Sequence, residues 1–151
     1  VPGSERSELL SMLRSYLVAH AGLVDPDRRH GDPTDYPYFD LYWSEPGRSP
    51  FWIEAGGRRA GFAMINDWSP SGRGVDQAVA EFHIDPALRR TGVGLAAAQA
   101  VFASRPGQWE LQVHKANPLG MGFWPRAVAA SGARDAEVID LGDRVVHRFR
   151  I

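Results

Sequence analysis

The chain has 151 residues, which fits one compact domain over 1–151 with a core of its own. Hydrophobic residues make up 44% of it, charged residues 23%, and the formal net charge is −1 at pH 7. A chain so close to neutrality lacks the strongly basic face that nucleic acid requires, so we expect no nucleic-acid partner. No apolar run approaches the roughly 20 residues that span a bilayer, so we expect no membrane partner.

Cysteine is absent from the sequence. Its absence excludes disulfides, cysteine nucleophiles and thiolate metal sites, and we expect no metal cofactor. No signal peptide precedes the first predicted helix, which favours the cytoplasm, although the start at Val1 rather than methionine leaves a removed leader open. No pattern defines the oligomeric state, and a homodimer is among the states left open.

The N-terminal part is predicted to hold two helical segments. A helix over 4–21, capped by Ser4 and ended by Gly22, is indicated by apolar residues at helical spacing, namely Leu9, Leu10, Leu13, Tyr16 and Leu17. A polar loop over 25–33 follows. The aromatic residues between 36 and 43 then indicate a short helix or helical turn, stopped by the Pro-Gly pair at 46–47.

The rest of the chain alternates between strands and helices. Two apolar runs predict a hairpin turned at Gly56 and Gly57. In chain order, the predicted elements are strands over 51–54, 60–65 and 77–84, a helix over 92–105, a strand over 109–114, a helix over 118–131, and strands over 136–141 and 144–150. This order predicts an α/β fold with a mixed, mostly antiparallel sheet flanked by helices on both faces.

The segment after the third strand is the most informative part of the sequence. Pro86 cannot donate a ladder hydrogen bond and marks the end of the strand. Arg89 and Arg90 then lead a Gly-x-Gly loop at 92–94 directly into an alanine-rich helix. Such a loop presents unpaired backbone N–H groups and the positive end of a helix dipole, with no bulky side chain in the way. It predicts a binding site for a phosphate or pyrophosphate.

Two common glycine motifs fit this loop poorly. A P-loop needs Gly-Lys-Ser/Thr, and no lysine lies here. A dinucleotide fingerprint tolerates Ala97 at its third position, but it expects an acidic residue at the end of a second parallel strand. Glu110 lies near the required distance, at the start of a strand. A nicotinamide enzyme is therefore disfavoured, while a glycine turn with a purely structural role stays open.

Two motifs resemble one enzyme family. Ile84-Asp85-Pro86 followed by Arg89-Arg90-Thr91-Gly92-Val93-Gly94 resembles the acyl-CoA pyrophosphate loop of the GNAT N-acetyltransferases, a V-x-P strand end followed by Q/R-x-x-G-x-G/A. Downstream, the positions where the family usually shows Asn, Ala, Phe and Tyr hold Asn117, Gly120, Phe123 and Trp124. The resemblance covers most of the chain from about Phe51, and 41–46 is similar to an uncharacterised predicted-acetyltransferase branch. It implies a GNAT-like fold.

The resemblance also implies acetyl-CoA as the co-substrate. The pyrophosphate would be cradled by backbone amides, with the side chain of Arg89 or Arg90 in support, and these amides are those of Arg90, Thr91, Gly92, Val93, Gly94 and Leu95. The backbone at Ile84 would pair with the pantetheine arm like an added strand and polarise the thioester carbonyl. Asn117 would either bond the pantetheine or cap the last helix.

The implied reaction is transfer of an acetyl group to a primary amine by direct attack in a ternary complex. Such an amine has a pKa of about 10.4 and must lose a proton before it attacks. Glu81 and His83 share one face of the third strand, because side chains alternate along a strand. Glu81 is the first candidate base, His83 the second and His114 a distant third. A structural Glu–His or Glu–Arg pair at the sheet rim is the alternative reading.

Trp124 departs from the family pattern, because an indole is too weak an acid to protonate the leaving thiolate. A non-catalytic acyl-CoA-binding module is therefore the alternative function, and a loop for another anionic ligand is a third. The nearest tyrosines in sequence are Tyr36, Tyr38 and Tyr42. Together with neighbouring acidic residues they form either a rim for a cationic small-molecule or protein amine or the packing of the second helix on the sheet.

Overall fold

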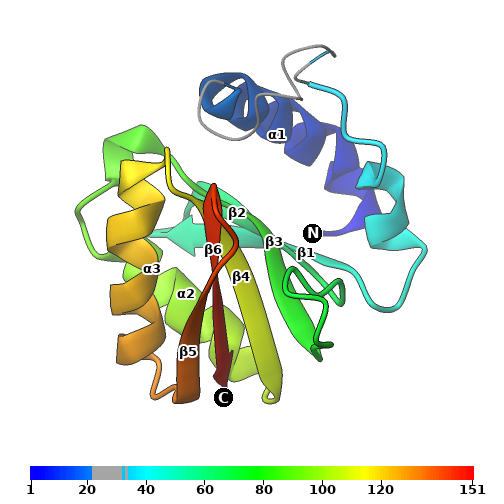
Figure 1. Cartoon of the computed structure of the whole chain (residues 1–151). Coiled ribbons are helices and arrows are strands. Elements are labelled where there is room, and N and C mark those ends of the chain that lie inside the picture. Colours follow the sequence, from blue (N-terminus) through cyan, green and yellow to red (C-terminus); the bar gives the residue numbers. More distant parts are fainter. Residues whose placement is uncertain (22–31, 33) are drawn as a thin grey trace.

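The computed structural model describes residues 1–21, 32 and 34–151, and Figure 1 shows their arrangement. The predicted loop over 25–33 lies outside the described residues except for Asp32. In chain order the elements are η1 (Gly3–Glu5), α1 (Arg6–His20), η3 (Phe39–Trp43), β1 (Ser49–Ala55), β2 (Arg58–Asn66), β3 (Gln77–Ile84), η4 (Pro86–Leu88), α2 (Val93–Ser104), β4 (Gln108–His114), α3 (Pro118–Ala130), β5 (Arg134–Asp140) and β6 (Arg144–Arg150).

Every helix and strand expected from the sequence is present, with ends that differ by at most two residues, except that the short helical segment expected between 36 and 43 begins only at Phe39. The prediction that Ser4 caps the first helix is wrong. Residues 3–5 form a 3₁₀ turn that runs straight into α1, so Ser4 lies inside a helical segment rather than before one. Glu5 takes the N-cap position and makes no side-chain cap bond.

The six strands form one sheet in the order β1-β2-β3-β4-β6-β5. All neighbouring strands are antiparallel except β3 and β4, which run parallel. Helix α1 covers one face of the sheet, and α2 and α3 cover the other (Figure 1). The predicted mixed, mostly antiparallel sheet with helices on both faces is therefore confirmed.

The alternating residues of β2 divide the core into two layers. Phe62 and Met64 are fully buried against α1 and η3, in a layer completed by Leu9, Leu13, Leu17, Phe39 and Tyr42. Ala63 and Ile65 point the other way, into the larger layer beneath α2 and α3. A strand buried on both faces holds the centre of the sheet and fixes which side each neighbouring side chain takes.

Strand β3 carries a bulge at Ala80. Ile65 pairs with Val79 and Met64 pairs with Glu81, so Ala80 has no partner on β2. As a result Val79 and Phe82 both pack in the layer under α2 and α3, where strict alternation would separate them. The bulge therefore resets which β3 side chains face α1.

The loop between β2 and β3 is anchored by a buried carboxylate. Glu110 on β4 is fully buried and accepts hydrogen bonds from the hydroxyls of Ser69 (3.0 Å) and Ser71 (2.6 Å) and from the Ser71 amide (2.9 Å). Arg148 on β6 completes the cluster with an ion pair. Burial alone would raise the pKa of Glu110, but these partners outweigh it and hold the pKa below its usual value.

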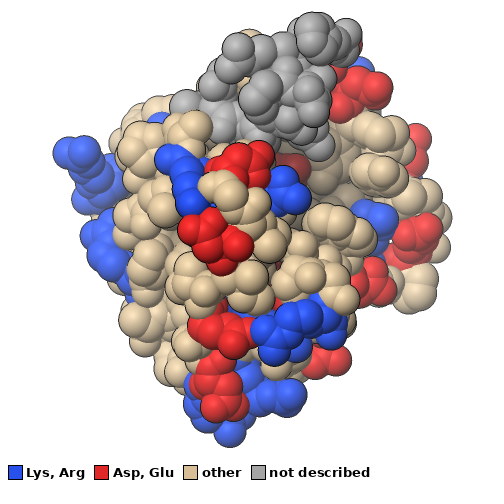
Figure 2. All heavy atoms as spheres, in the orientation of Figure 1, with Lys and Arg blue, Asp and Glu red and all other residues tan. Residues whose placement is uncertain are grey.

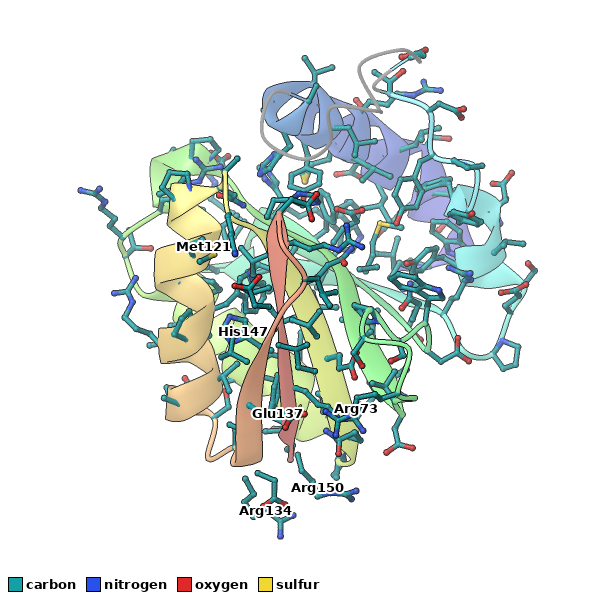
Figure 3. All side chains as sticks on the ribbon, viewed as in Figure 1. Arg73, Met121, Arg134, Glu137, His147 and Arg150 are labelled. Carbon is teal, nitrogen blue, oxygen red and sulfur yellow. The ribbon has the colours of Figure 1, made fainter. Side chains whose placement is uncertain are left out.

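Charged side chains are spread over the surface. Figure 2 shows Lys and Arg interspersed with Asp and Glu on the visible face, with no extended patch of one sign. At the end of the sheet far from α1, Arg73 in the β2–β3 loop pairs with Glu137 on β5 (Figure 3). Within the described part of the chain, no helix is long and apolar enough to cross a membrane.

Candidate active site

Strands β3 and β4 pair only over their first residues. The register pairs are Gln77–Trp109, Ala78–Glu110 and Val79–Leu111, although β3 runs on to Ile84 and β4 to His114. The two strands part beside the bulge at Ala80. From that point the edge of β3 that faces β4 lacks a strand partner, so its backbone groups are available to an extended ligand.

The turn after β3 presents a row of amides. Asp85 accepts a hydrogen bond from the Ala87 amide at 2.9 Å and starts the short turn η4. Arg90 and Gly92 then adopt left-handed backbone angles, with φ of 62° and 88°. Glycine takes this conformation without strain, whereas an arginine such as Arg90 is strained in it. The chain is thereby turned so that α2 begins at the end of β3.

The amides at this turn have no acceptor within the described residues. Gly92 caps α2 without a side-chain bond, and the first bond to its carbonyl comes from Ala96, at 3.1 Å. The amides from Thr91 to Leu95 are therefore left for an external acceptor. Together with the positive end of the α2 dipole they give this turn the features that favour an anion.

The two arginines before the turn lie differently. Arg89 bends back toward the α1 side, where its Nε donates to the Ile84 carbonyl at 3.3 Å. It also lines a groove beside α1. Arg90 is exposed at the turn itself. Unlike that of Arg89, the Arg90 side chain makes no hydrogen bond or ion pair with the described residues.

Asn117 caps the last helix. Its Oδ1 accepts a hydrogen bond from the Gly120 amide at 3.1 Å, at the start of α3. A Cβ on Gly120 would lie 2.8 Å from Asn117 Nδ2 and 2.9 Å from Val113 Cγ1. The absence of a side chain at position 120 therefore permits the cap to sit close to β4. The capping role predicted for Asn117 is observed, and its contact with pantetheine stays a prediction.

Glu81 and His83 share the face of β3 that is turned to α1. They pair across β2 with Met64 and Phe62, which belong to the core layer under α1. The rings of His83 and Tyr16 have centroids 5.5 Å apart. The shared face expected from strand alternation is thus present, and it lies on the side of the sheet away from α2 and α3.

His83 is held as a neutral imidazole. Burial lowers its pKa below the usual 6.5, and the nearby charges of Arg89 and His20 lower it further, against a smaller opposing effect of Asp85. Its Nδ1 is buried and has no hydrogen-bond partner in the described part of the chain. A neutral imidazole at pH 7 can accept a proton.

Two tyrosines far from β3 in sequence lie close to Glu81. Burial, then the Glu81 carboxylate, raise the pKa of Tyr36. Burial chiefly raises the pKa of Tyr42 as well, and Arg48 opposes the shift. The Tyr42 side chain is buried, and its hydroxyl has no hydrogen-bond partner among the described residues. Both tyrosines were candidates from the sequence, but no spacing along the chain indicates that they lie close to Glu81.

Trp124 serves the core. It is 9% exposed and packs against the rings of Phe82, Phe102 and Phe123, at centroid distances of 5.1, 6.4 and 4.8 Å. This cluster lies on the α2 and α3 side of the sheet, opposite Glu81 and His83. His114, the third candidate base, lies at the end of β4 beyond its last pair with β3.

A groove of about 390 Å³ lies between α1 and the end of β3. Its walls include Tyr16 and His20 from α1, and His83, Pro86 and Arg89 from the other side. The side of His83 that faces α1 is therefore bordered by an open space. No three His, Asp or Glu side chains of the described residues gather as a metal site.

The fold and the strand gap define a class of protein: this is the GNAT fold of acetyltransferases, as the sequence resemblance implied. No family model matches the chain, and no curated protein matches it in sequence. Solved structures do match over nearly its whole length.

Three of these structures illustrate the likeness. A GNAT-family acetyltransferase from Streptococcus agalactiae has a TM-score of 0.68 at 12% identity, covering 100% of this chain and 92% of its own. An acetyltransferase from Thermus thermophilus has a TM-score of 0.63 at 17% identity, with coverages of 100% and 94%. The PaiA N-acetyltransferase from Thermoplasma acidophilum, in complex with coenzyme A, has a TM-score of 0.60 at 15% identity, with coverages of 98% and 94%. At these identities the likeness shows the fold.

Proposed function

We propose that this protein is an acetyl-CoA-dependent N-acetyltransferase that transfers an acetyl group to a primary amine in a ternary complex. One observation carries the proposal. The gap between β3 and β4, which opens after Val79 and Leu111, leads directly to the unpaired amides at the start of α2. A ligand with an extended amide-bearing arm and a pyrophosphate fits both features at once.

Acetyl-CoA has this shape. Its pyrophosphate would accept hydrogen bonds from the amides of residues 90–95, with Arg90 adding charge. Its pantetheine arm would run along the free edge of β3 toward Glu81, pairing with the backbone near Ile84. A related protein of this fold, PaiA from Thermoplasma acidophilum, is known in complex with coenzyme A. When bound, acetyl-CoA supplies the activated acyl group.

The residues of this chain would then manage the proton of the amine. The ammonium proton first passes to Glu81 or, through water, to His83, and the neutral amine nitrogen then attacks the thioester carbon and the C–S bond breaks. His83 is suited to this because its lowered pKa keeps it neutral. Trp124 does not protonate the leaving thiolate, since its indole is packed in the core. Water supplies that proton in our proposal.

The first test is ligand binding. The thermal unfolding of the purified protein is measured with CoA, with acetyl-CoA and with NADH as a control dinucleotide. At a ligand concentration of about 100 times Kd, binding adds about 2.7 kcal/mol to the free energy of unfolding, a shift of several degrees. We expect a shift with both CoA compounds and none with NADH. The proposal would be overturned if neither CoA nor acetyl-CoA shifted the unfolding temperature.

The second test is turnover. Release of free CoA is followed with a thiol reagent over a panel of amines, and the protein contributes no background because it has no cysteine. Glu81→Gln and His83→Ala are compared with the parent protein. We expect Glu81→Gln to lower kcat by about 10²-fold. If both variants keep the parental rate and pH profile, neither residue is the base.

A second candidate function rests on Trp124. Its burial in the core leaves the position of the family's usual acid without an acidic group. A non-catalytic acyl-CoA-binding module would show the thermal shift with both CoA compounds, yet release no thiol with any amine. The two tests together therefore separate an enzyme from a binding module.

A further inference from the structure

We propose that the acceptor is a small amine that also carries an anionic group, a carboxylate or a phosphate, and that Arg89 binds this group in the groove between α1 and the end of β3. The inference rests on the proposed acetyltransferase function and names its substrate class. It comes from the charges that line the groove.

The Arg89 guanidinium is available for a ligand. Its Nε donates to the Ile84 carbonyl at 3.3 Å, which fixes the side chain on the α1 side, and no carboxylate of the described residues pairs with its other nitrogens. An arginine presents a planar fork of donors that matches carboxylate and phosphate oxygens. An arginine held in place beside a cavity, without an acidic partner, is therefore a recognition element for an oxyanion.

The rest of the groove wall favours the same charge. Among the described residues that line the groove, Glu8 is the one carboxylate, and Arg59 neutralises it through an ion pair. His20 lies opposite, and its Nδ1 donates to the Tyr16 carbonyl at 2.9 Å, since a carbonyl can only accept. Of the Asp, Glu, Lys and Arg side chains among the described groove-lining residues, Arg89 is thus the one without an ion pair.

Of the four acidic residues expected near a cationic acceptor, Asp32, Asp35, Asp40 and Glu45, the last two form ion pairs with arginines. Asp40 pairs with Arg6 at 3.4 Å, and Glu45 pairs with Arg48 at 2.8 Å. Both pairs lie at the surface. A rim whose carboxylates face arginines offers little attraction to a polycation such as a polyamine, so the remaining charge preference of the site is set by the groove.

The spacing suits one small molecule. Glu81 precedes His83 by two residues on the same face, which places them about 7 Å apart along the strand. Arg89 borders the groove next to His83, as its effect on the pKa of that imidazole indicates. His83 and Arg89 line the same groove, so an amine whose proton passes to His83 and an anion at Arg89 can belong to one compact substrate, such as an amino acid or an amino phosphate.

The test compares matched amines that differ in the anionic group. Tyramine is paired with tyrosine, agmatine with arginine, and ethanolamine with phosphoethanolamine, and CoA release gives kcat and KM for each. We expect the anionic member of at least one pair to have a kcat/KM more than about tenfold higher. The first two pairs report a carboxylate preference, and the third reports a phosphate preference.

Variants then locate the effect. Arg89→Gln is expected to raise the KM for the preferred anionic amine about tenfold or more, with little change in kcat, because it removes binding rather than transition-state stabilisation. Arg89→Lys, which keeps the charge but not the fork, is expected to lie between. Arg134→Gln removes the same charge at the far end of the sheet and serves as the matched control (Figure 3). The inference would be overturned if the amines without an anionic group reacted as well as those that carry one. It would also be overturned if Arg89→Gln changed KM equally for both members of a pair.

Equilibrium binding keeps the inference testable without turnover. Calorimetry measures the affinity of each amine for the protein in the presence and absence of CoA, and the affinity for CoA itself. We expect Arg89→Gln to weaken binding of the anionic amines and leave the CoA Kd within about threefold of the parent. Loss of CoA affinity instead would assign Arg89 to the co-substrate and refute its role toward the acceptor. Failure of the parent protein to bind CoA would refute the proposed function itself, while the binding of anionic amines would still report on the groove.

Discussion

Val79 and Leu111 form the last register pair between the parallel strands β3 and β4. Beyond them, five residues of β3 and three of β4 extend without pairing to each other, and the separation starts at the bulged Ala80. Because β3 remains paired with β2 on its other side, its free edge is held straight and ready for a ligand. The gap between β3 and β4 therefore begins at the bulge in β3.

Amide hydrogen exchange tests whether CoA binds in the gap between β3 and β4. Backbone amides of residues 81–84 that face the gap should exchange faster than those of β2, since they lack a strand partner. Saturating CoA should slow their exchange, because the pantetheine arm would supply acceptors along the edge. The amides of β5, the strand at one edge of the sheet and two strands away from β4, provide the internal control. Unchanged exchange in 81–84 at a CoA concentration that shifts the melting temperature would show that CoA binds elsewhere.

The sequence located the anion loop because its signals are local. Pro86 ends the strand, and the glycine at position 92 takes the left-handed angle of 88° that turns the chain into α2. The bulge at Ala80 has no such signal, since neither glycine nor proline marks it. The approach of Tyr36 and Tyr42 to Glu81 depends on how η3 packs across the sheet, which no spacing along the chain encodes. Local chemistry was predictable, and long-range contacts required the structure.

The left-handed backbone of Gly92 is the basis of a second prediction. Gly92→Ala places a Cβ on a backbone with φ of 88°, which should lower the free energy of unfolding by about 1–2 kcal/mol. It should also weaken CoA binding about tenfold, because the amides at the start of α2 lose their arrangement. Gly142→Ala, at φ 95° in the β5–β6 turn, is the matched control. It should show a similar loss of stability in chemical denaturation and an unchanged CoA Kd. Equal CoA affinities in the two variants would contradict a pyrophosphate site at this turn.

Trp124 gives a third prediction. If its role is packing against Phe82 and Phe102, Trp124→Phe and Trp124→Tyr should both lower the free energy of unfolding by about 1–3 kcal/mol. Their kcat values should agree within about threefold, because the added hydroxyl would enter the core rather than the reaction. Steady-state CoA release and urea denaturation measure the two effects. A kcat that rises only in Trp124→Tyr would instead place position 124 beside the thiolate.

The buried cluster around Glu110 gives a fourth. Glu110→Gln leaves Arg148 without its counter-charge, and breaking a buried ion pair costs about 3–5 kcal/mol. The variant should therefore unfold at a much lower urea concentration. Arg73→Gln breaks the exposed pair with Glu137 and should change the free energy of unfolding by less than about 1 kcal/mol. If the two variants were equally stable, the cluster would not be what anchors the β2–β3 loop.

Two buried histidines give a fifth prediction, on the pH dependence of stability. His83 lies on the α1 side of β3, and His147 lies on β6 opposite Leu111, in the layer beneath α3 (Figure 3). Burial lowers the pKa of both imidazoles below the unfolded value of 6.5. As the pH falls through 6.5 the unfolded chain takes up protons that the folded chain does not, so the folded state loses stability.

The size of this effect can be bounded and assigned. Each histidine contributes at most about 1.4 kcal/mol per pH unit to the slope of the unfolding free energy against pH. Between pH 6.5 and the folded pKa values the two together therefore contribute at most about 2.7 kcal/mol per pH unit. Carboxylates contribute little in this range because their unfolded pKa values lie near 4, and the stability that Glu110 supplies is lost only at lower pH. Urea unfolding from pH 7 to 5 should therefore show a slope that falls by a similar amount in His83→Gln and in His147→Gln. A slope that neither substitution changes would mean that the two imidazoles have the same pKa in the folded and the unfolded protein, so that burial does not lower the pKa of His83.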